Sequence, residues 1–139
     1  MGGKVKLNRS VQEEPGKEKY LRILNSAIKI FARKGFHHTR VSEIAREAGV
    51  ADGTIYLYFR NKDDILIKVF EESLRQIIDR FEKELKKEPD PISRLERFIW
   101  LHLELLEENK ALAEVLQVEL RQSHKFMKEY VPVEFLRYI

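Results

Sequence analysis

The chain has 139 residues, of which 43% are hydrophobic and 35% are charged, and its net charge is +3. This composition is typical of a globular protein with enough apolar material for a packed core. The absence of cysteine excludes disulfides, thiolate catalysis and cysteine-ligated metal sites. No apolar run approaches the roughly 18 to 20 residues of a membrane span, and the basic N-terminus lacks the apolar stretch of a signal peptide. We therefore expect a cytoplasmic protein that makes no membrane contact.

The charge is distributed unevenly along the chain. Residues 1–70 contain 14 Lys and Arg against 8 Asp and Glu, a balance of +6, whereas residues 71–139 contain 12 against 15, a balance of −3. A basic front half followed by an acidic back half indicates that only the front half meets a polyanion.

The first periodic segment begins after a short tail. Residues 1–16 show no periodicity and end in Pro15-Gly16, which predicts a flexible basic tail. From Lys17 onward, apolar residues recur at steps of three and four, the period of an amphipathic helix. Gly35 follows two basic residues and is the expected C-cap of this first helix.

Two short helices are expected next. Thr39 is the expected N-cap of a second helix over residues 40–48, which Gly49 ends. A third short helix is expected over residues 52–58.

Three longer helical segments follow, each with a recognisable start. Asn61 with Asp64 three positions later predicts the N-terminus of a long fourth helix. Asp90-Pro91 starts a fifth, because Asp is a good N-cap and Pro is favoured at the first helical position. Asn109 is the expected cap of a sixth helix.

The sixth helix is expected to run to about Gln122, and Ser123 is a candidate cap for a seventh. No segment alternates like a strand, so the fold class is all-α. The sequence stops at Ile139 within an apolar stretch, so we expect further helices to follow.

One spacing within the first half predicts a helix-turn-helix. Two short helices joined by a tight turn need a small residue where they cross, a glycine at the turn and an apolar plug on the second helix. Ala45, Gly49 and Ile55 supply these at offsets of zero, four and ten. Such a unit places the N-terminal part of its second helix in the major groove of DNA.

The side chains around this unit suit DNA. Asp52, Gly53 and Thr54 fall on the first turn of the recognition helix, where side chains reach base edges. Hydroxyls and cations that suit phosphates flank them: Tyr56, Tyr58, Arg40, Arg60 and Lys62. An alanine and a glycine at this spacing also occur in many helical proteins without DNA. The additional position of Ile55 and the run GTIYLYF, a poor helix former rich in Tyr and Thr, favour the DNA interpretation.

At these residues the chain resembles the TetR family of transcriptional repressors, in the stretch from about Tyr20 to Leu66. The residues that carry the resemblance are ILNSAIKIFARKGFHHTRVSEIAREAGVADGTIYLYFRNKDDIL, with the pattern G-x-T-x-Y-x-Y-F followed by N-K. The resemblance implies a three-helix DNA-binding domain over residues 17–62 and a helical regulatory domain over residues 63–139, truncated at its C-terminus. It also implies a homodimer, when full length, on a pseudo-palindromic operator of double-stranded DNA.

The resemblance assigns individual DNA contacts. Those at the second helix are His38, Thr39 and Arg40; those at the third are Asp52, Gly53, Thr54, Tyr56 and Tyr58; Lys62 clamps a phosphate at the start of the fourth helix. Phe59 is expected in the core. Many family members carry Ser or Thr where this chain has Ala51, so the recognition helix lacks a side-chain N-cap and Ala51 is left out of the expected contacts.

Within the family, ADGTIYLYFRNKDDIL and the later VELRQS are most similar to repressors of fatty-acid degradation that release DNA on binding long-chain acyl-CoA. An acyl chain needs a dry apolar lining and a CoA head needs cations nearby. The expected lining is Trp100, Leu103, Leu116 and Leu120, with Arg121, or alternatively Arg97, at the CoA head. The alternative for each apolar residue is an ordinary core position.

Other functions remain open. A TetR-type regulator of a different inducer class, such as one controlling drug efflux, fits the same front half, as does an architectural DNA binder without ligand control. The sequence shows no catalytic set, no cofactor motif and no metal site. His37 and His38 are adjacent, so their side chains point apart and make a poor metal pair. We therefore expect a regulator and not an enzyme.

Overall fold

The computed structural model describes residues 16–123, apart from the side chain of Leu120, and within this range the protein is all-helical. The expected all-α class is confirmed. The elements are α1 Lys17–Lys34, α2 Val41–Ala48, α3 Asp52–Tyr58, α4 Lys62–Leu85, α5 Pro91–Glu108, α6 Lys110–Gln117 and the 3₁₀ helix η1 Glu119–Gln122. The predicted flexible tail and seventh helix lie outside the described residues.

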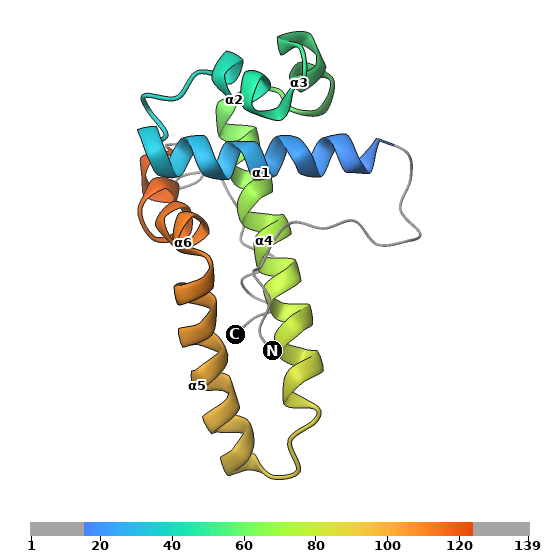
Figure 1. Ribbon diagram of the computed structural model, residues 1–139, viewed down its shortest axis with the longest axis vertical. Helices are drawn as coiled ribbons and strands as arrows, with labels where there is room; N and C mark the ends of the chain where they lie inside the picture. The colour runs from blue at the N-terminus through green and yellow to red at the C-terminus, as the bar shows by residue number, and fades with distance from the viewer. Residues whose placement is uncertain (1–15, 124–139) are drawn as a thin grey trace.

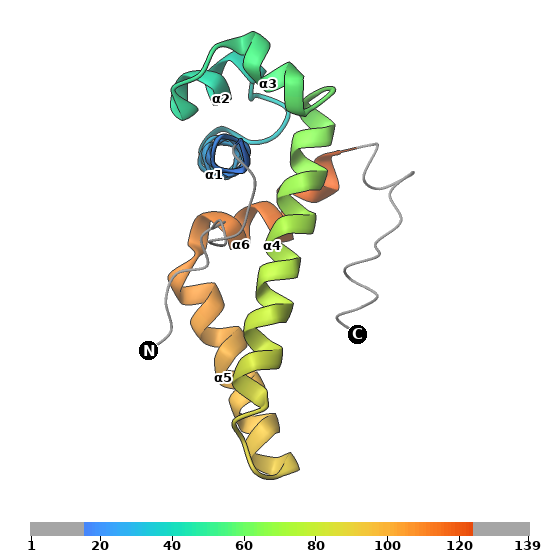
Figure 2. The same cartoon turned by 90° about the vertical axis from the view of Figure 1, so that its right-hand side faces the viewer.

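The helices form a small head at one end of a long two-helix stem. Helices α2 and α3 occupy the end of the molecule, and α1 crosses beneath them (Figure 1). Helix α4 starts at the head and runs the whole length of the stem, and α5 returns beside it (Figures 1 and 2). Helix α6 brings the chain back under α1, so that the head rests on α6 as well as on α4.

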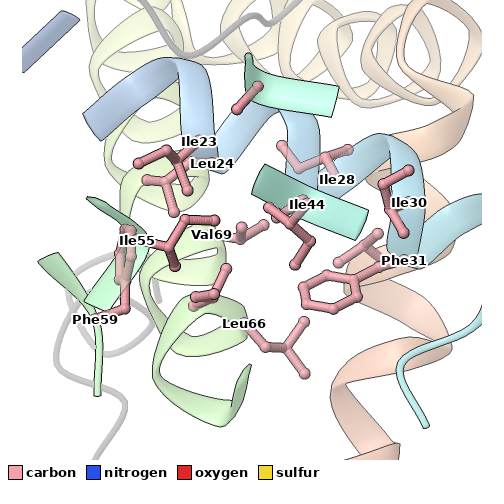
Figure 3. Close-up of a cluster of buried hydrophobic side chains, with 14 of the residues drawn as sticks. Ile23, Leu24, Ile28, Ile30, Phe31, Ile44, Ile55, Phe59, Leu66 and Val69 are labelled. Carbon is pink, nitrogen blue, oxygen red and sulfur yellow. The ribbon is translucent and has the colours of Figure 1, made fainter. Parts of the chain in front are cut away.

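One hydrophobic core joins the head to the stem. Side chains of α1, α2 and α3 converge on α4, with Phe31, Ile44 and Ile55 fully or almost fully buried among them (Figure 3). Leu112 and Val115 of α6 belong to the same cluster. Burying a side chain of this size contributes about 1.5 to 3 kcal/mol. The expected boundary after residue 62 therefore falls within one continuous core.

The predicted helix starts at Asn61 and Asp90 are confirmed. The Asn61 carboxamide accepts a hydrogen bond from the Asp64 amide at 2.9 Å, and Asp90 accepts one from the Ser93 amide at 3.0 Å. These two side chains satisfy backbone donors that a helix leaves free at its N-terminus. Gly35 caps α1 as expected, with φ at 84° and its amide bonded to the Phe31 carbonyl.

The prediction of Thr39 as a helix cap was wrong. Arg40 is the N-cap of α2, and its amide donates to the Glu43 carboxylate at 3.1 Å. The Thr39 hydroxyl turns the other way and donates to the Gly35 carbonyl at 2.7 Å. It thereby satisfies a carbonyl at the end of α1. At the start of α2, the side chain of Glu43 accepts from the backbone instead.

The sixth helix is shorter than expected. It ends at Gln117, and η1 continues the chain to Gln122. Asn109 stands at its N-cap position, but the side chain donates backward to the Leu105 carbonyl at 3.2 Å and provides no side-chain cap.

Helix α5 is only partly covered within the described residues. Leu101 is buried against Ile77 and Phe81 of α4, in a second small core. Much of the remaining apolar surface is exposed: Ile92, Leu95, Ile99, Trp100, Leu103 and Leu106. No helix between residues 16 and 123 combines the length and apolar character needed to cross a bilayer.

Candidate nucleic-acid interface

Helices α2 and α3 and the turn between them have the predicted helix-turn-helix geometry. Ala45 and Ile55 are 1% and 0% exposed, so the small crossing residue and the plug lie where the spacing puts them. Gly49 ends α2 with φ at 70°, a left-handed conformation that glycine adopts at low cost. The next amide, of Val50, reaches back to the Ala45 carbonyl at 2.9 Å and closes the turn.

Helix α3 has one face in the core and the opposite face in solvent. Ile55 is fully buried, whereas Gly53 and Leu57, two residues on either side of it, are both exposed. At 3.6 residues per turn, these two positions point about 160° away from Ile55. Tyr56 lies at the edge of this face and is 56% exposed. Asp52 is exposed at the N-terminus of the helix, and Thr54 is half-buried.

Among residues 16–123, no contact or backbone conformation requires a glycine at position 53. A side-chain Cβ there would have no neighbour within 4 Å, and Gly53 has no positive φ, unlike Gly49. Glycine in a helix is less stable than alanine by roughly 0.5 to 1 kcal/mol. The missing side chain therefore costs the protein stability and leaves the backbone of the outward face bare.

Tyr56 and Tyr58, whose hydroxyls are expected to reach phosphates, differ in solvent exposure. Tyr56 projects into solvent, but Tyr58 is half-buried against Tyr20, with ring centroids 6.0 Å apart. A Cβ at Gly16 would lie 3.5 Å from the Tyr58 hydroxyl, which places that hydroxyl beside the start of α1. Burial, reinforced by the carboxylate of Glu72, raises the pKa of Tyr20 well above its usual range.

The loop between α1 and α2 presents His37 and His38 to solvent. Thr39 is 3% exposed, so its hydroxyl is not available on the surface that the resemblance assigns to DNA. Arg40 is exposed beside it. Glu43 accepts from the Arg40 amide and forms an ion pair with Lys34, and this pairing holds the pKa of the Glu43 carboxyl below its usual value.

Lys62, the expected phosphate clamp, is bonded within the protein. Its ammonium donates to the carbonyls of Phe36 at 2.6 Å and His37 at 3.4 Å. It also lies 4.4 Å from the centroid of the Phe36 ring, a cation–π distance. Partial burial lowers the pKa of the Lys62 ammonium. Lys62 thus anchors the loop that carries the two histidines.

Two contacts to this region come from the far end of the described chain, and no sequence pattern predicts either. The buried Glu119 carboxylate of η1 accepts from the Phe36 amide at 2.7 Å. Ser123 donates to the Asp63 carboxylate at 2.5 Å. Phe36 is consequently held at both backbone groups, its amide by Glu119 and its carbonyl by Lys62. We call these three residues the Phe36 clamp.

The electrostatics of the two parts differ in sign. Residues 17–62 contain 10 Lys and Arg against 4 Asp and Glu, whereas residues 63–123 contain 10 against 15. The balances are +6 and −5. The excess of positive charge therefore lies on the head that carries α3, as polyanion binding requires.

The residues expected to bind ligand are not brought together. Trp100 and Leu103 are 61% and 52% exposed on α5, and Arg121 is exposed on η1. The side chain of Leu120 lies outside the described residues. Of the expected residues whose side chains are described, only Leu116 lines an apolar cavity between α4, α5 and α6, together with Ile77, Leu105, Leu106, Asn109, Leu112, Ala113 and Gln117.

That cavity holds about 80 Å³, far below the roughly 300 to 1,000 Å³ of typical ligand pockets. In the described arrangement this cavity is too small for a long acyl chain. Within the described residues, no cluster of three or more His, Asp or Glu is arranged to hold a metal ion.

Comparison with known families divides the chain at residue 69. Residues 23–69 match the bacterial regulatory proteins of the TetR family, and residues 70–136 match the C-terminal region of YsiA-like proteins. The first match covers the head and the start of α4, and the second covers the stem.

The similar proteins include regulators of fatty-acid metabolism. The chain is 44% identical over 113 residues to a fatty acid metabolism regulator protein of Bacillus subtilis, which covers 81% of this chain and 58% of that protein. The crystal structure of FadR from Bacillus subtilis with stearoyl-CoA has 42% identity and a TM-score of 0.78, over 86% of this chain and 64% of that one. FadR from Bacillus halodurans has 34% identity and a TM-score of 0.78, over 91% and 66%. The chain therefore spans about three fifths to two thirds of the length of these relatives.

Proposed function

We propose, since the chain belongs to the TetR family of bacterial regulatory proteins, that it represses transcription in fatty-acid metabolism by binding operator DNA through α2 and α3. A regulator of this kind works in the cytoplasm, where the DNA is. The observation that carries the proposal is the outward face of α3, which is exposed, free of bulk at Gly53 and set on a head with a charge balance of +6. A face of this kind suits the major groove.

The proposed contacts follow from where each side chain lies. Gly53, Tyr56 and Asp52 face the bases or the groove edge, and Asp52 suits the amino group of a cytosine. His38 and Arg40 suit phosphates at the start of α2. Thr39 and Lys62 act indirectly, because both are bonded to the loop that positions the histidines. Two heads of a homodimer occupy successive major grooves about 34 to 36 Å apart.

A long-chain acyl-CoA is the proposed inducer. The similarity to FadR with bound stearoyl-CoA supports this choice, as does the apolar character of α5 and of the cavity beside Leu116. Because α6 shares its core with α1 and η1 bonds to Phe36, enlarging the cavity displaces elements on which the head rests. The displacement changes the spacing between two heads and weakens operator binding.

The test is fluorescence anisotropy of the protein with labelled DNA from upstream of fatty-acid-degradation genes, or with an operator selected from random DNA. We expect tight, salt-sensitive binding that is lost on addition of stearoyl-CoA and retained with free CoA. Tight binding that ignores stearoyl-CoA would reject the inducer and leave a TetR-type repressor of another ligand. Failure to recover any operator by selection would reject DNA binding altogether.

A further inference from the structure

Leu57 is the most exposed large hydrophobic side chain within the described residues, at 82%. It stands on the last turn of α3, one residue before the helix ends at Tyr58, and on the face opposite the buried Ile55, four residues after Gly53. An isolated exposed leucine is ordinary on a protein surface. This one lies on the outward face of α3 on which the proposed function depends, with Gly53 one turn earlier and Tyr56 at the edge of the same face.

We propose that Leu57 is a specificity-determining residue that reads the C5-methyl group of a thymine in the operator. The inference rests on the proposed DNA-binding function and deepens it. Apolar side chains discriminate thymine by contact with this methyl group, which is the one apolar group on a base edge in the major groove. An aliphatic side chain offers no hydrogen bond to any other base and no favourable contact with phosphate.

The geometry of α3 favours this role. Positions 53 and 57 share one face of the helix, one turn apart, and glycine at 53 lets the backbone approach the groove closely. A close approach brings the Leu57 side chain to the depth of the base edges and away from the sugar-phosphate rim. The hydroxyl of Tyr56, at the edge of the same face, remains free for the rim.

The positive charge of the head favours DNA over a protein partner on the outward face of α3. The head has a balance of +6, with Arg40, Arg46 and Arg60 exposed around the two short helices. The α2–α3 end also lies away from the apolar face of α5 (Figures 1 and 2). Leu57 is therefore an exposed aliphatic side chain within a basic surface, and is separate from the apolar face of α5.

The test is a double-mutant cycle that removes either the methyl group of a thymine or the side chain of Leu57 beyond its Cβ. An operator selected from random DNA is synthesised with deoxyuridine at each thymine of one half-site in turn, and the affinities of the native protein and of Leu57→Ala are measured. At one position, we expect deoxyuridine to weaken the native protein roughly fourfold, the value of one buried methyl group, and to leave Leu57→Ala unchanged. Substitution in both half-sites together should weaken it roughly fifteenfold.

Tyr56→Phe is the matched control, because it alters an exposed side chain of the same helix without touching the proposed contact. It should weaken binding equally for thymine and deoxyuridine. Circular dichroism verifies that all variants are folded. If no thymine shows coupling to Leu57, or if Leu57→Ala binds as the native protein does, the inference is overturned while the proposed function stands. If selection yields no operator for the native protein, the proposed function itself fails.

Discussion

Replacing Gly53 with alanine should make the protein more stable and a weaker DNA binder. Alanine at this exposed helical position meets no neighbour within 4 Å and adopts the backbone conformation without strain. The gain in helix propensity is at most about 0.5 to 1 kcal/mol, the value for a helix interior, because Gly53 lies on the first turn of α3. For a chain of this size, such a gain raises the melting temperature by roughly 2 to 5 °C. DNA affinity should fall, because a methyl group now occupies the face that contacts the groove.

The size of that fall can be estimated from packed interfaces. Forcing an extra methyl group into a close-packed contact costs about 1 to 3 kcal/mol, which corresponds to a loss of roughly 5- to 150-fold in affinity. Stability is measured by urea unfolding followed by circular dichroism, and affinity by anisotropy on the selected operator. A single variant that is more stable than the native protein and binds DNA more weakly identifies a residue that serves function at the expense of stability.

Gly49 provides the matched comparison, since a Cβ there also has no neighbour within 4 Å. Its φ of 70° makes Gly49→Ala strained, so that variant should lose about 1 kcal/mol or more of stability. A Gly53→Ala protein that is less stable than the native one would refute the claim that the fold does not need this glycine. Unchanged DNA affinity would refute the close approach of α3 to the groove.

Three further outcomes follow from the contacts around the head. Glu119→Ala should lower the free energy of unfolding by about 1 to 3 kcal/mol and speed hydrogen exchange of the Phe36 amide, because that buried donor loses its partner. Lys62→Met should lower the free energy of unfolding by a similar amount and leave the salt dependence of DNA binding unaltered. If the slope of log affinity against log salt concentration fell by about one, Lys62 would also reach a phosphate. Tyr20→Phe should tolerate alkaline pH better than the native protein, because burial raises the pKa of Tyr20 in the folded state. The native protein should lose stability above about pH 10, where the tyrosine of the unfolded chain ionises first. Equal alkaline unfolding curves for the two proteins would contradict this.

The features that could be predicted from sequence are those set by a few adjacent residues. Asn61 and Asp90 cap helices through bonds to amides three residues away, so each motif contains both partners. The helix-turn-helix was predictable for the same reason, since Ala45, Gly49 and Ile55 lie within eleven positions of one another. Periodicity then located the long helices, because an amphipathic stripe repeats over many turns.

The errors arose where a distant or competing partner decides the outcome. Thr39 is a good N-cap by type, but the carbonyl of Gly35 lies within reach of its hydroxyl and takes it. Lys62 was expected to clamp a phosphate, and its bonds to the loop carbonyls of Phe36 and His37 are contacts that no local pattern contains. Glu119 finds the Phe36 amide across 83 residues, a pairing that no local pattern contains. The apolar residues of α5 were ambiguous because periodicity does not identify the element that covers them.

The continuous core has a consequence for control of DNA binding. Residues of α6 are buried in the same cluster as α1, and the Phe36 clamp ties η1 to the loop before α2. Regulation of a DNA-binding protein needs a coupling free energy of about 1 to 3 kcal/mol between its two sites. One buried hydrogen bond of the kind that joins Glu119 to Phe36 has this magnitude when its partner is withdrawn. A movement of α6 that breaks this bond would therefore supply a coupling free energy of the size that the proposed regulation requires.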